Sequence, residues 1–173
     1  MRVLAIDPGS ERSALVAVED DRRISLSVIL DNDEVRRKLY ELRAHYPIAI
    51  ESIASYGMPV GREVFDTCYW IGRFIEASYP HLVALVYRKD VKMHLCGTTR
   101  AKDPNIRQAL LDKFGKEATK GIKKDLWAAL GVAVTHLERS MNWKGDRETD
   151  ILIRGAKCAE MKEVLKEFKI ENK

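Results

Sequence analysis

The chain has 173 residues, of which 46% are apolar and 32% charged, and its formal net charge is +4. This length suits one domain with a hydrophobic core that needs no disulfides. The apolar runs all fall short of the roughly 20 residues of a membrane span, and an acid at position 7 comes too early for a signal peptide. We therefore expect a cytoplasmic protein with no membrane association.

Apolar runs in the first third of the chain predict three strands, over residues 2–6, 13–19 and 24–30. The first run ends at the turn sequence Asp-Pro-Gly-Ser, and a polar stretch suits a hairpin between the second and third. A helix is predicted next, over residues 33–45, with Asp31-Asn32-Asp33 able to cap its start. Pro47 ends this helix.

The remaining part of the chain alternates strands and helices. Further strands are predicted over residues 48–50 and 82–86, and helices over residues 62–78, 88–95, 103–114 and 123–140. Asp103 and Pro104 suit the N-cap and first position of one helix, and Gly115 its end. This order predicts an α/β fold, with a mixed five-stranded sheet flanked by helices. We assign it to residues 1–140. Residues 141–173 form an extension, with a short helix over 157–168 packed on the domain or at a dimer interface.

Positive charge is concentrated in one segment. Residues 88–124 hold eleven Lys and Arg against four Asp and Glu, so this segment carries +7 and the rest of the chain −3. Clustered positive charge suits a polyanion such as nucleic acid, because neutralising phosphates releases counterions. A solvated, lysine-rich face is the alternative. The predicted phosphate contacts in this segment are Arg100, Lys102, Lys120, Lys123 and Lys124.

Three acids occupy positions where a site could form. Asp7 ends the first strand, Glu51 ends the fourth, and Asp125 opens the last core helix. If the first and fourth strands are neighbours, Asp7 and Glu51 lie side by side and Asp125 can approach from the helix. Three converging carboxylates repel each other unless a cation binds them, and oxygen ligands favour Mg²⁺, with Mn²⁺ as a substitute. Each acid alone could instead be a turn former, a surface charge or a helix-end acid.

The cysteines predict no further site. Cys68, Cys96 and Cys158 are widely spaced and form no CxxC pair, so neither a disulfide framework nor a zinc ribbon is indicated. We interpret them as structural. His94 and Cys96 could supply half of a metal site, but the sequence offers no matching second half.

Three segments resemble RuvC-type Holliday junction resolvases of the RNase H-like superfamily. They are Ala-Ile-Asp-Pro-Gly-Ser at residues 5–10, Ile-Ala-Ile-Glu at 48–51, and the helix from Asp125 to His136. The resemblance implies an RNase H-like fold, a homodimer, Mg²⁺ and paired nicks across a four-way junction. It makes Asp7, Glu51 and Asp125 metal ligands. The chain departs from the family at Ala128, where bacterial members typically have a second aspartate. This departure leaves room for a divergent branch, such as a phage-type resolvase, in which specificity for four-way junctions need not be strict.

The resemblance also suggests DNA contacts. The loop after Glu51 carries Ile53, Tyr56 and Met58, in a region that approaches the junction centre in the family; these side chains either stack on bases or pack on the core. Lys124 is expected to act in catalysis or to position the scissile phosphate. Ser10 and Arg62 complete the predicted nucleic-acid contacts.

Three other functions fit the sequence less well. An actin-like ATPase or sugar kinase needs two such domains, which 173 residues cannot supply. A junction-binding protein without catalysis fits the absent fourth acid, although acids at the other three positions argue against it. An RNase H-like nuclease acting on RNA–DNA hybrids or flaps would share the same fold.

Overall fold

Five strands form one mixed sheet in the order β3-β2-β1-β4-β5. The computed structural model describes residues 2–55, 57 and 59–141. The strands are β1 (Val3–Asp7), β2 (Arg12–Val18), β3 (Ile24–Asp31), β4 (Ile48–Ser52) and β5 (Val83–Tyr87). The helices are α1 (Asn32–Leu42), α2 (Arg62–Ser78), α3 (Arg88–Cys96), α4 (Asp103–Ala118) and α5 (Leu126–Met141). The predicted α/β fold is therefore confirmed.

The sheet has an antiparallel half and a parallel half. β1, β2 and β3 pair antiparallel, whereas β4 pairs parallel with both β1 and β5, with Ile6 opposite Ile50. The carboxyl ends of β1, β4 and β5 consequently meet at one edge of the sheet. This confirms that the first and fourth strands are neighbours.

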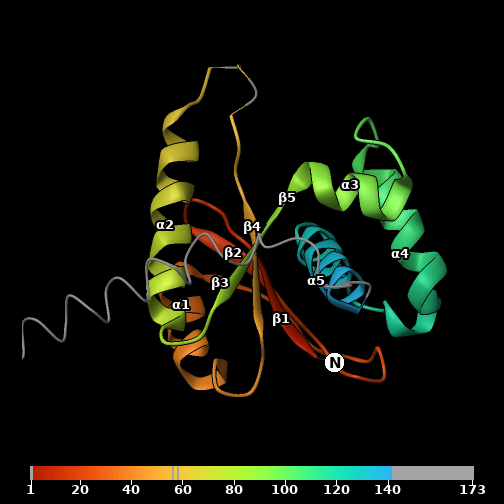
Figure 1. The fold of residues 1–173 in the computed structure, drawn as a ribbon, viewed down its shortest axis with the longest axis horizontal. Helices are drawn as coiled ribbons and strands as arrows, with labels where there is room; N and C mark the ends of the chain where they lie inside the picture. Colours follow the sequence, from red (N-terminus) through yellow and green to blue (C-terminus); the bar gives the residue numbers. More distant parts are fainter. Residues whose placement is uncertain (1, 56, 58, 142–173) are drawn as a thin grey trace, which may run out of the picture. The chain divides into compact units, whose positions relative to one another are not determined.

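Helices cover both faces of the sheet (Figure 1). Alternate residues of β1 belong to different cores: Val3 and Ala5 pack with α3, α4 and α5, whereas Leu4 and Ile6 pack with α1 and α2. Because side chains alternate along a strand, the odd-numbered positions of β1 face α5. Burial of these apolar side chains on both faces is the main stabilising contribution to the fold.

Two helix starts differ from the prediction. Asp31 is the N-cap of α1, but its side chain makes no capping hydrogen bond within the described helix. The N-cap of α4 is Lys102 rather than Asp103, and the Asn105 side chain accepts a 2.9 Å hydrogen bond from the backbone N–H of Lys102. The Asn105 side chain, which accepts this bond, takes the place of the expected Asp103 cap. Gly115 interrupts α4 with φ 80°, where the sequence predicts the helix end.

The buried face of α2 also differs from the prediction. The sequence pattern places Cys68 on the apolar face, but Cys68 is exposed and Phe74 is fully buried. The buried face passes through Thr67, Ile71 and Phe74 at helical spacing. The prediction failed because both sides of this helix carry apolar residues, so spacing alone did not select the one facing the sheet.

A buried hydrogen-bond network holds the turn that follows β1. The Ser13 hydroxyl donates to Asn32 Oδ1 over 2.6 Å, and Asn32 Nδ2 donates to the Gly9 carbonyl over 2.9 Å. The Gly9 N–H donates to Ser13 Oγ over 3.2 Å. A side chain at Gly9 would place its Cβ 2.3 Å from the Arg12 carbonyl oxygen, so this turn requires glycine. The network fixes the backbone directly after Asp7.

The predicted extension lies outside the described residues from position 142 onward, including its helix over 157–168 and Cys158. Among the helices of the described ranges, none is long and apolar enough to span a membrane.

Candidate acidic active site

The carboxyl edge of the parallel strands opens into a cavity of about 330 Å³. All four residues predicted to be catalytic line it, together with others that come from α3, α4 and α5. The lining residues are Asp7, Glu51, Arg88, Asp103, Ile106, Lys124, Asp125, Trp127 and Ala128. The topology explains this convergence, because β1, β4 and β5 all end at this edge.

Asp7 and Glu51 form a largely buried acidic pair. Asp7 comes two residues after Ala5, and Glu51 comes two residues after Ala49; both alanines pack in the core on the α5 side of the sheet. Because alternate residues of a strand face the same side, both carboxylates project to that side. Burial, followed by repulsion from Glu51, raises the pKa of Asp7 to about 8. Burial also raises the pKa of Glu51, against the opposing effect of Arg88. Without a bound cation, the pair therefore retains a proton on Asp7 at neutral pH.

Arg88 is the cation nearest to this pair and was not predicted as a site residue. Its guanidinium lies 3.6 Å from Glu51 Oε2 and donates a 2.6 Å hydrogen bond to Asp103 Oδ1. Burial opposes its charge, but the two carboxylates outweigh burial and raise the pKa of Arg88 further. Arg88 is thus a permanent positive charge in the cavity.

Asp125 and Lys124 reach the cavity from the turn before α5. Both side chains are exposed, and Lys124 has a φ of 46°, in the left-handed region. The Lys124 carbonyl accepts a hydrogen bond from Trp127 N, and the Asp125 carbonyl accepts one from Ala129 N. Non-glycine residues in this region are strained, and such strain is concentrated at functional sites.

The strain at Lys124 can be tested by comparing two substitutions. We expect Lys124→Gly to be more stable than Lys124→Ala by about 1 kcal/mol, because only glycine relaxes a positive φ. Chemical denaturation measures this difference. Arg22 in the β2–β3 turn has a φ of 63° and is the matched control. Its glycine and alanine variants should show the same stability difference and leave cleavage unchanged, whereas both Lys124 variants should lose activity. Equal stability of the two Lys124 variants would contradict the strained turn.

The donor set suits a hard divalent cation, although the ligands do not converge fully. Glu51 Oε2 is buried without a hydrogen-bond partner among the described residues, as expected of an oxygen that binds a cation. However, the described residues contain no group of three or more His, Cys, Asp or Glu close enough to hold a metal. Asp7 and Glu51 are adjacent, and Asp125 lines the same cavity and repels the Asp7 carboxylate. The residues therefore fit Mg²⁺ in the kind of donor atom they offer.

The predicted nucleic-acid contacts fall outside the cavity lining, apart from Lys124. Arg100 and Lys102 are exposed between α3 and α4, and Lys120 and Lys123 are exposed before α5. Arg62 begins α2 and pairs with Asp66 over 3.5 Å. Ser10 lies half-buried in the turn after β1, and Ile53 is exposed after β4. Tyr56 and Met58 lie outside the described residues.

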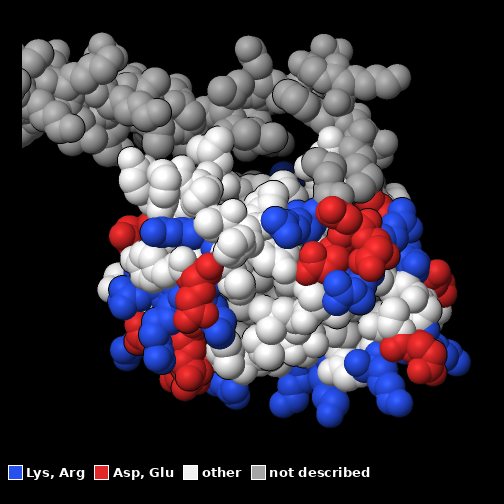
Figure 2. All heavy atoms as spheres, turned by 90° about the horizontal axis from the view of Figure 1, so that it is seen from below, with Lys and Arg blue, Asp and Glu red and all other residues white. Residues whose placement is uncertain are grey.

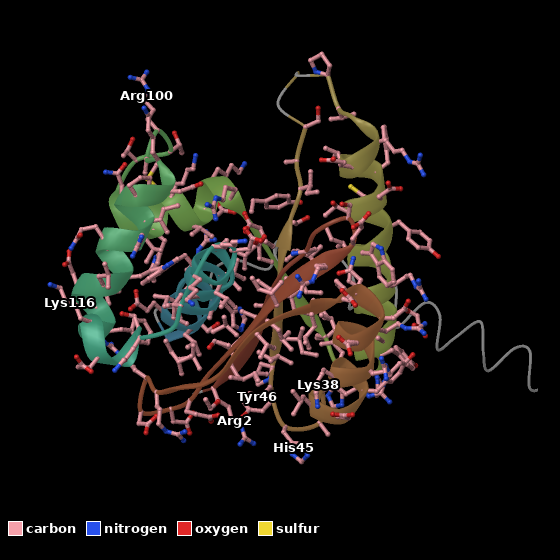
Figure 3. All side chains as sticks on the ribbon, turned by 180° about the vertical axis from the view of Figure 1, so that it is seen from behind. Arg2, Lys38, His45, Tyr46, Arg100 and Lys116 are labelled. Carbon is pink, nitrogen blue, oxygen red and sulfur yellow. The ribbon has the colours of Figure 1, made fainter. Side chains whose placement is uncertain are left out.

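The opposite end of the molecule has a different character. Arg100 lies at one end, and Arg2, His45 and Tyr46 lie at the other (Figure 3). Viewed from below, that second end shows acidic and basic side chains around a central area without charge (Figure 2). Charges of both signs are typical of an ordinary solvated surface.

The possible half-site at His94 and Cys96 does not become a metal site within the described residues. His94 Nε2 lies 2.7 Å from Glu138 Oε2, and Lys113 donates to the same carboxylate. This group joins α3, α4 and α5. Its role is structural.

The strand order and the helices on both faces of the sheet define an RNase H-like α/β fold. No protein-family model matches the sequence, and no curated protein is significantly similar to it. The structure is similar to Thermus thermophilus RuvC, with a TM-score of 0.68 and 20% identity, over 82% of this chain and 96% of that chain. It is also similar to T. thermophilus RuvC in complex with a Holliday junction substrate, with a TM-score of 0.68 and 19% identity, over 81% and 94% of the two chains. The chain therefore has the RuvC fold.

Proposed function

We propose that the chain is a metal-dependent endonuclease that nicks four-way and related branched DNA junctions by hydrolysing phosphodiester bonds. The Asp7–Glu51 pair carries this proposal, because two largely buried carboxylates with raised pKa values lie at the sheet edge of a fold similar to that of a junction-bound RuvC. Burying two adjacent acids is costly, and cation binding is the function that offsets the cost.

Each residue has a role in this proposal. Asp7, Glu51 and Asp125 would hold Mg²⁺ or Mn²⁺, which supplies Lewis acidity and a water nucleophile at neutral pH. Lys124 lies beside Asp125 and orients the scissile phosphate. The exposed basic residues around α4 would hold the DNA arms, with Arg100, Lys102, Lys120 and Lys123 contacting the backbone. The cytoplasmic location predicted from the sequence belongs to the same proposal.

The experiment is cleavage of labelled substrates with Mg²⁺, Mn²⁺ or EDTA. A four-way junction, a flap, a linear duplex and an RNA–DNA hybrid are compared at equal concentration. We expect metal-dependent, paired nicks near the junction centre and little cutting of the duplex. Preferential cutting of the hybrid or the flap would mean that this substrate, rather than the junction, is the one that the protein cuts. EDTA-insensitive cutting would contradict the metal site.

A second candidate is a junction-binding protein without catalysis. Ala128 removes one expected acid, and the remaining three do not form a closed metal site in the structure. Tight junction binding without cuts in either metal would favour this function. Restoring an acid with Ala128→Asp would then be the first change to make.

The proposed nuclease acts as a homodimer, since paired nicks on a two-fold junction require two sites. We propose that two copies meet along the outer face of α2. Phe65 and Tyr69, one helical turn apart, are each 63% exposed, and exposed aromatic pairs of this kind are typical of interfaces.

The dimer is tested by analytical ultracentrifugation. Phe65→Glu combined with Tyr69→Glu should convert a dimer to a monomer, because four added charges would face each other across the two-fold interface. Tyr40→Glu on α1, where Tyr40 is 43% exposed, is the control and should leave the dimer intact. A monomeric unsubstituted protein would contradict the proposal.

A further inference from the structure

The charge balance of the cavity differs from that of a site lined by acids alone. Of the described residues that line it, four carry a carboxylate and two carry a positive charge. With every acid ionised, the lining has a net formal charge of −2, which one divalent cation neutralises. Of the two positively charged side chains, Arg88 lies between two of the acids, Glu51 and Asp103.

Asp103 fixes the orientation of Arg88. The 2.6 Å bond from Arg88 Nη2 to Asp103 Oδ1 joins the start of α3 to the start of α4, and Arg88 is 30% exposed whereas Asp103 is 80% exposed. A charge-assisted bond of this length restricts the rotation of the guanidinium. The planar group is therefore presented to the cavity in one orientation.

The other end of the guanidinium makes an ion pair but no hydrogen bond. Arg88 Nη1 is buried and lies 3.6 Å from Glu51 Oε2, and neither atom has a hydrogen-bond partner among the described residues. A buried donor without an acceptor is costly in a folded protein. A phosphate oxygen entering the cavity would supply the acceptor, and arginine binds such oxygens with its planar fork.

The position one turn after Asp125 is also relevant. Ala128 lines the same cavity, so no carboxylate is present there to hold a second cation. We propose that Arg88, oriented by Asp103, binds the phosphodiester that is cut and supplies the charge that a second divalent ion would otherwise supply. This inference rests on the proposed nuclease function. Arg88 is then a catalytic residue, because it contacts substrate, and Asp103 is a positioning residue.

The first measurement counts metal ions. Titration calorimetry with Mn²⁺ is expected to give one ion per chain for the unsubstituted protein and for Arg88→Gln, and the variant should bind the ion at least as tightly, because a positive charge beside Glu51 is removed. Two ions bound to the unsubstituted protein would overturn the inference. One ion bound without loss of affinity in Arg88→Gln supports it, because it shows that Arg88 is not needed to hold the metal.

The second measurement separates substrate binding from cleavage. With Ca²⁺ in place of Mg²⁺, Arg88→Gln should bind a four-way junction about tenfold more weakly, and with Mg²⁺ it should cleave roughly 10²- to 10³-fold more slowly. Free guanidinium ion should restore part of the cleavage activity lost in Arg88→Gln, whereas potassium ion at the same ionic strength should not. Asp103→Asn should show a smaller loss, and Arg88→Lys an intermediate one. Arg37→Gln on α1, an exposed arginine paired with Glu34, is the control and should change nothing.

The two proposals fail in different ways. If the unsubstituted protein cleaves junctions and Arg88→Gln cleaves within threefold of it, the inference is wrong and the nuclease function stands. If the unsubstituted protein cleaves no substrate, the nuclease function fails. In that case the Ca²⁺ binding measurement still decides whether Arg88 contacts phosphate, and equal junction binding by Arg88→Gln would overturn the inference.

Discussion

Asp7→Asn is expected to abolish junction cleavage and, at the same time, to stabilise the metal-free protein at pH 8. The loss of cleavage follows from removing a charged metal ligand, and we expect it to exceed about 10³-fold. The gain in stability follows from the buried position of Asp7 beside Glu51, where its negative charge is unfavourable. An asparagine has nearly the same shape as a protonated aspartate and carries no charge.

The gain in stability of the Asp7→Asn variant should increase as the pH rises. The pKa of Asp7 is about 8 in the folded protein, against an ordinary value of 3.8, so the folded state binds more protons than the unfolded state between these values. The stability contributed by the protonated form is fully present below pH 3.8 and is lost as the pH rises to about 8. The Asp7→Asn variant lacks this loss. The two proteins should therefore have similar stability near pH 4 and differ by at least about 2 kcal/mol at pH 8.

Urea denaturation in EDTA at a series of pH values measures this difference. Asp112→Asn is a suitable control, since Asp112 is exposed on α4 and hydrogen-bonded to Gln108. This control should change neither cleavage nor the pH dependence. An Asp7→Asn variant that is less stable than the unsubstituted protein at pH 8 would show that the acidic pair is not strained.

Metal binding should release a proton and strengthen steeply with pH. The cation must displace the proton from Asp7, because the pKa of this acid is about 8 and the ligand binds metal as a carboxylate. Below pH 8 we expect the affinity for Mn²⁺ to rise about tenfold per pH unit and to level off above it. Between pH 6 and pH 8 this amounts to roughly a hundredfold change.

Calorimetry in buffers of different ionisation enthalpy counts the protons released. At pH 6.5 we expect about one proton per Mn²⁺ from the unsubstituted protein and close to none from Asp7→Asn, which should bind weakly at every pH. A flat affinity between pH 6 and pH 8 would mean that Asp7 is already ionised before metal binds. Such a result would mean that neither acid of the pair holds a proton in this pH range.

The sequence was sufficient to predict the sheet and half of the site. Apolar runs of three to seven residues identified all five strands, and the acids at the ends of two of them predicted the Asp7–Glu51 pair. These features are local in sequence. A buried strand is recognised from its run of apolar residues, and its last residue is recognised from where that run ends. The parallel pairing of β1 and β4 then follows from the general topology of mixed sheets.

Arg88 and Asp103 were missed because their roles depend on contacts distant in sequence. Arg88 follows β5 in the same way that Glu51 ends β4, and its place two residues after buried Val86 was a usable signal. The sequence reading instead counted Arg88 as one of many basic residues. Asp103 was interpreted as a helix cap, whereas its side chain orients a guanidinium 15 residues away. Neither pairing can be read from local spacing.

The Gly9–Ser13–Asn32 network has a consequence for how the site opens. Its hydrogen bonds tie the turn after Asp7 to the first residue of α1, and Ser13 and Asn32 are each 1% exposed. The Gly9 amide can therefore exchange with solvent deuterium only when the sheet itself unfolds. Asp125, by contrast, lies on an exposed turn whose amides can exchange through local fluctuation. The cavity thus has one rigid wall and one adjustable wall, and adaptation to different substrates would come from the second.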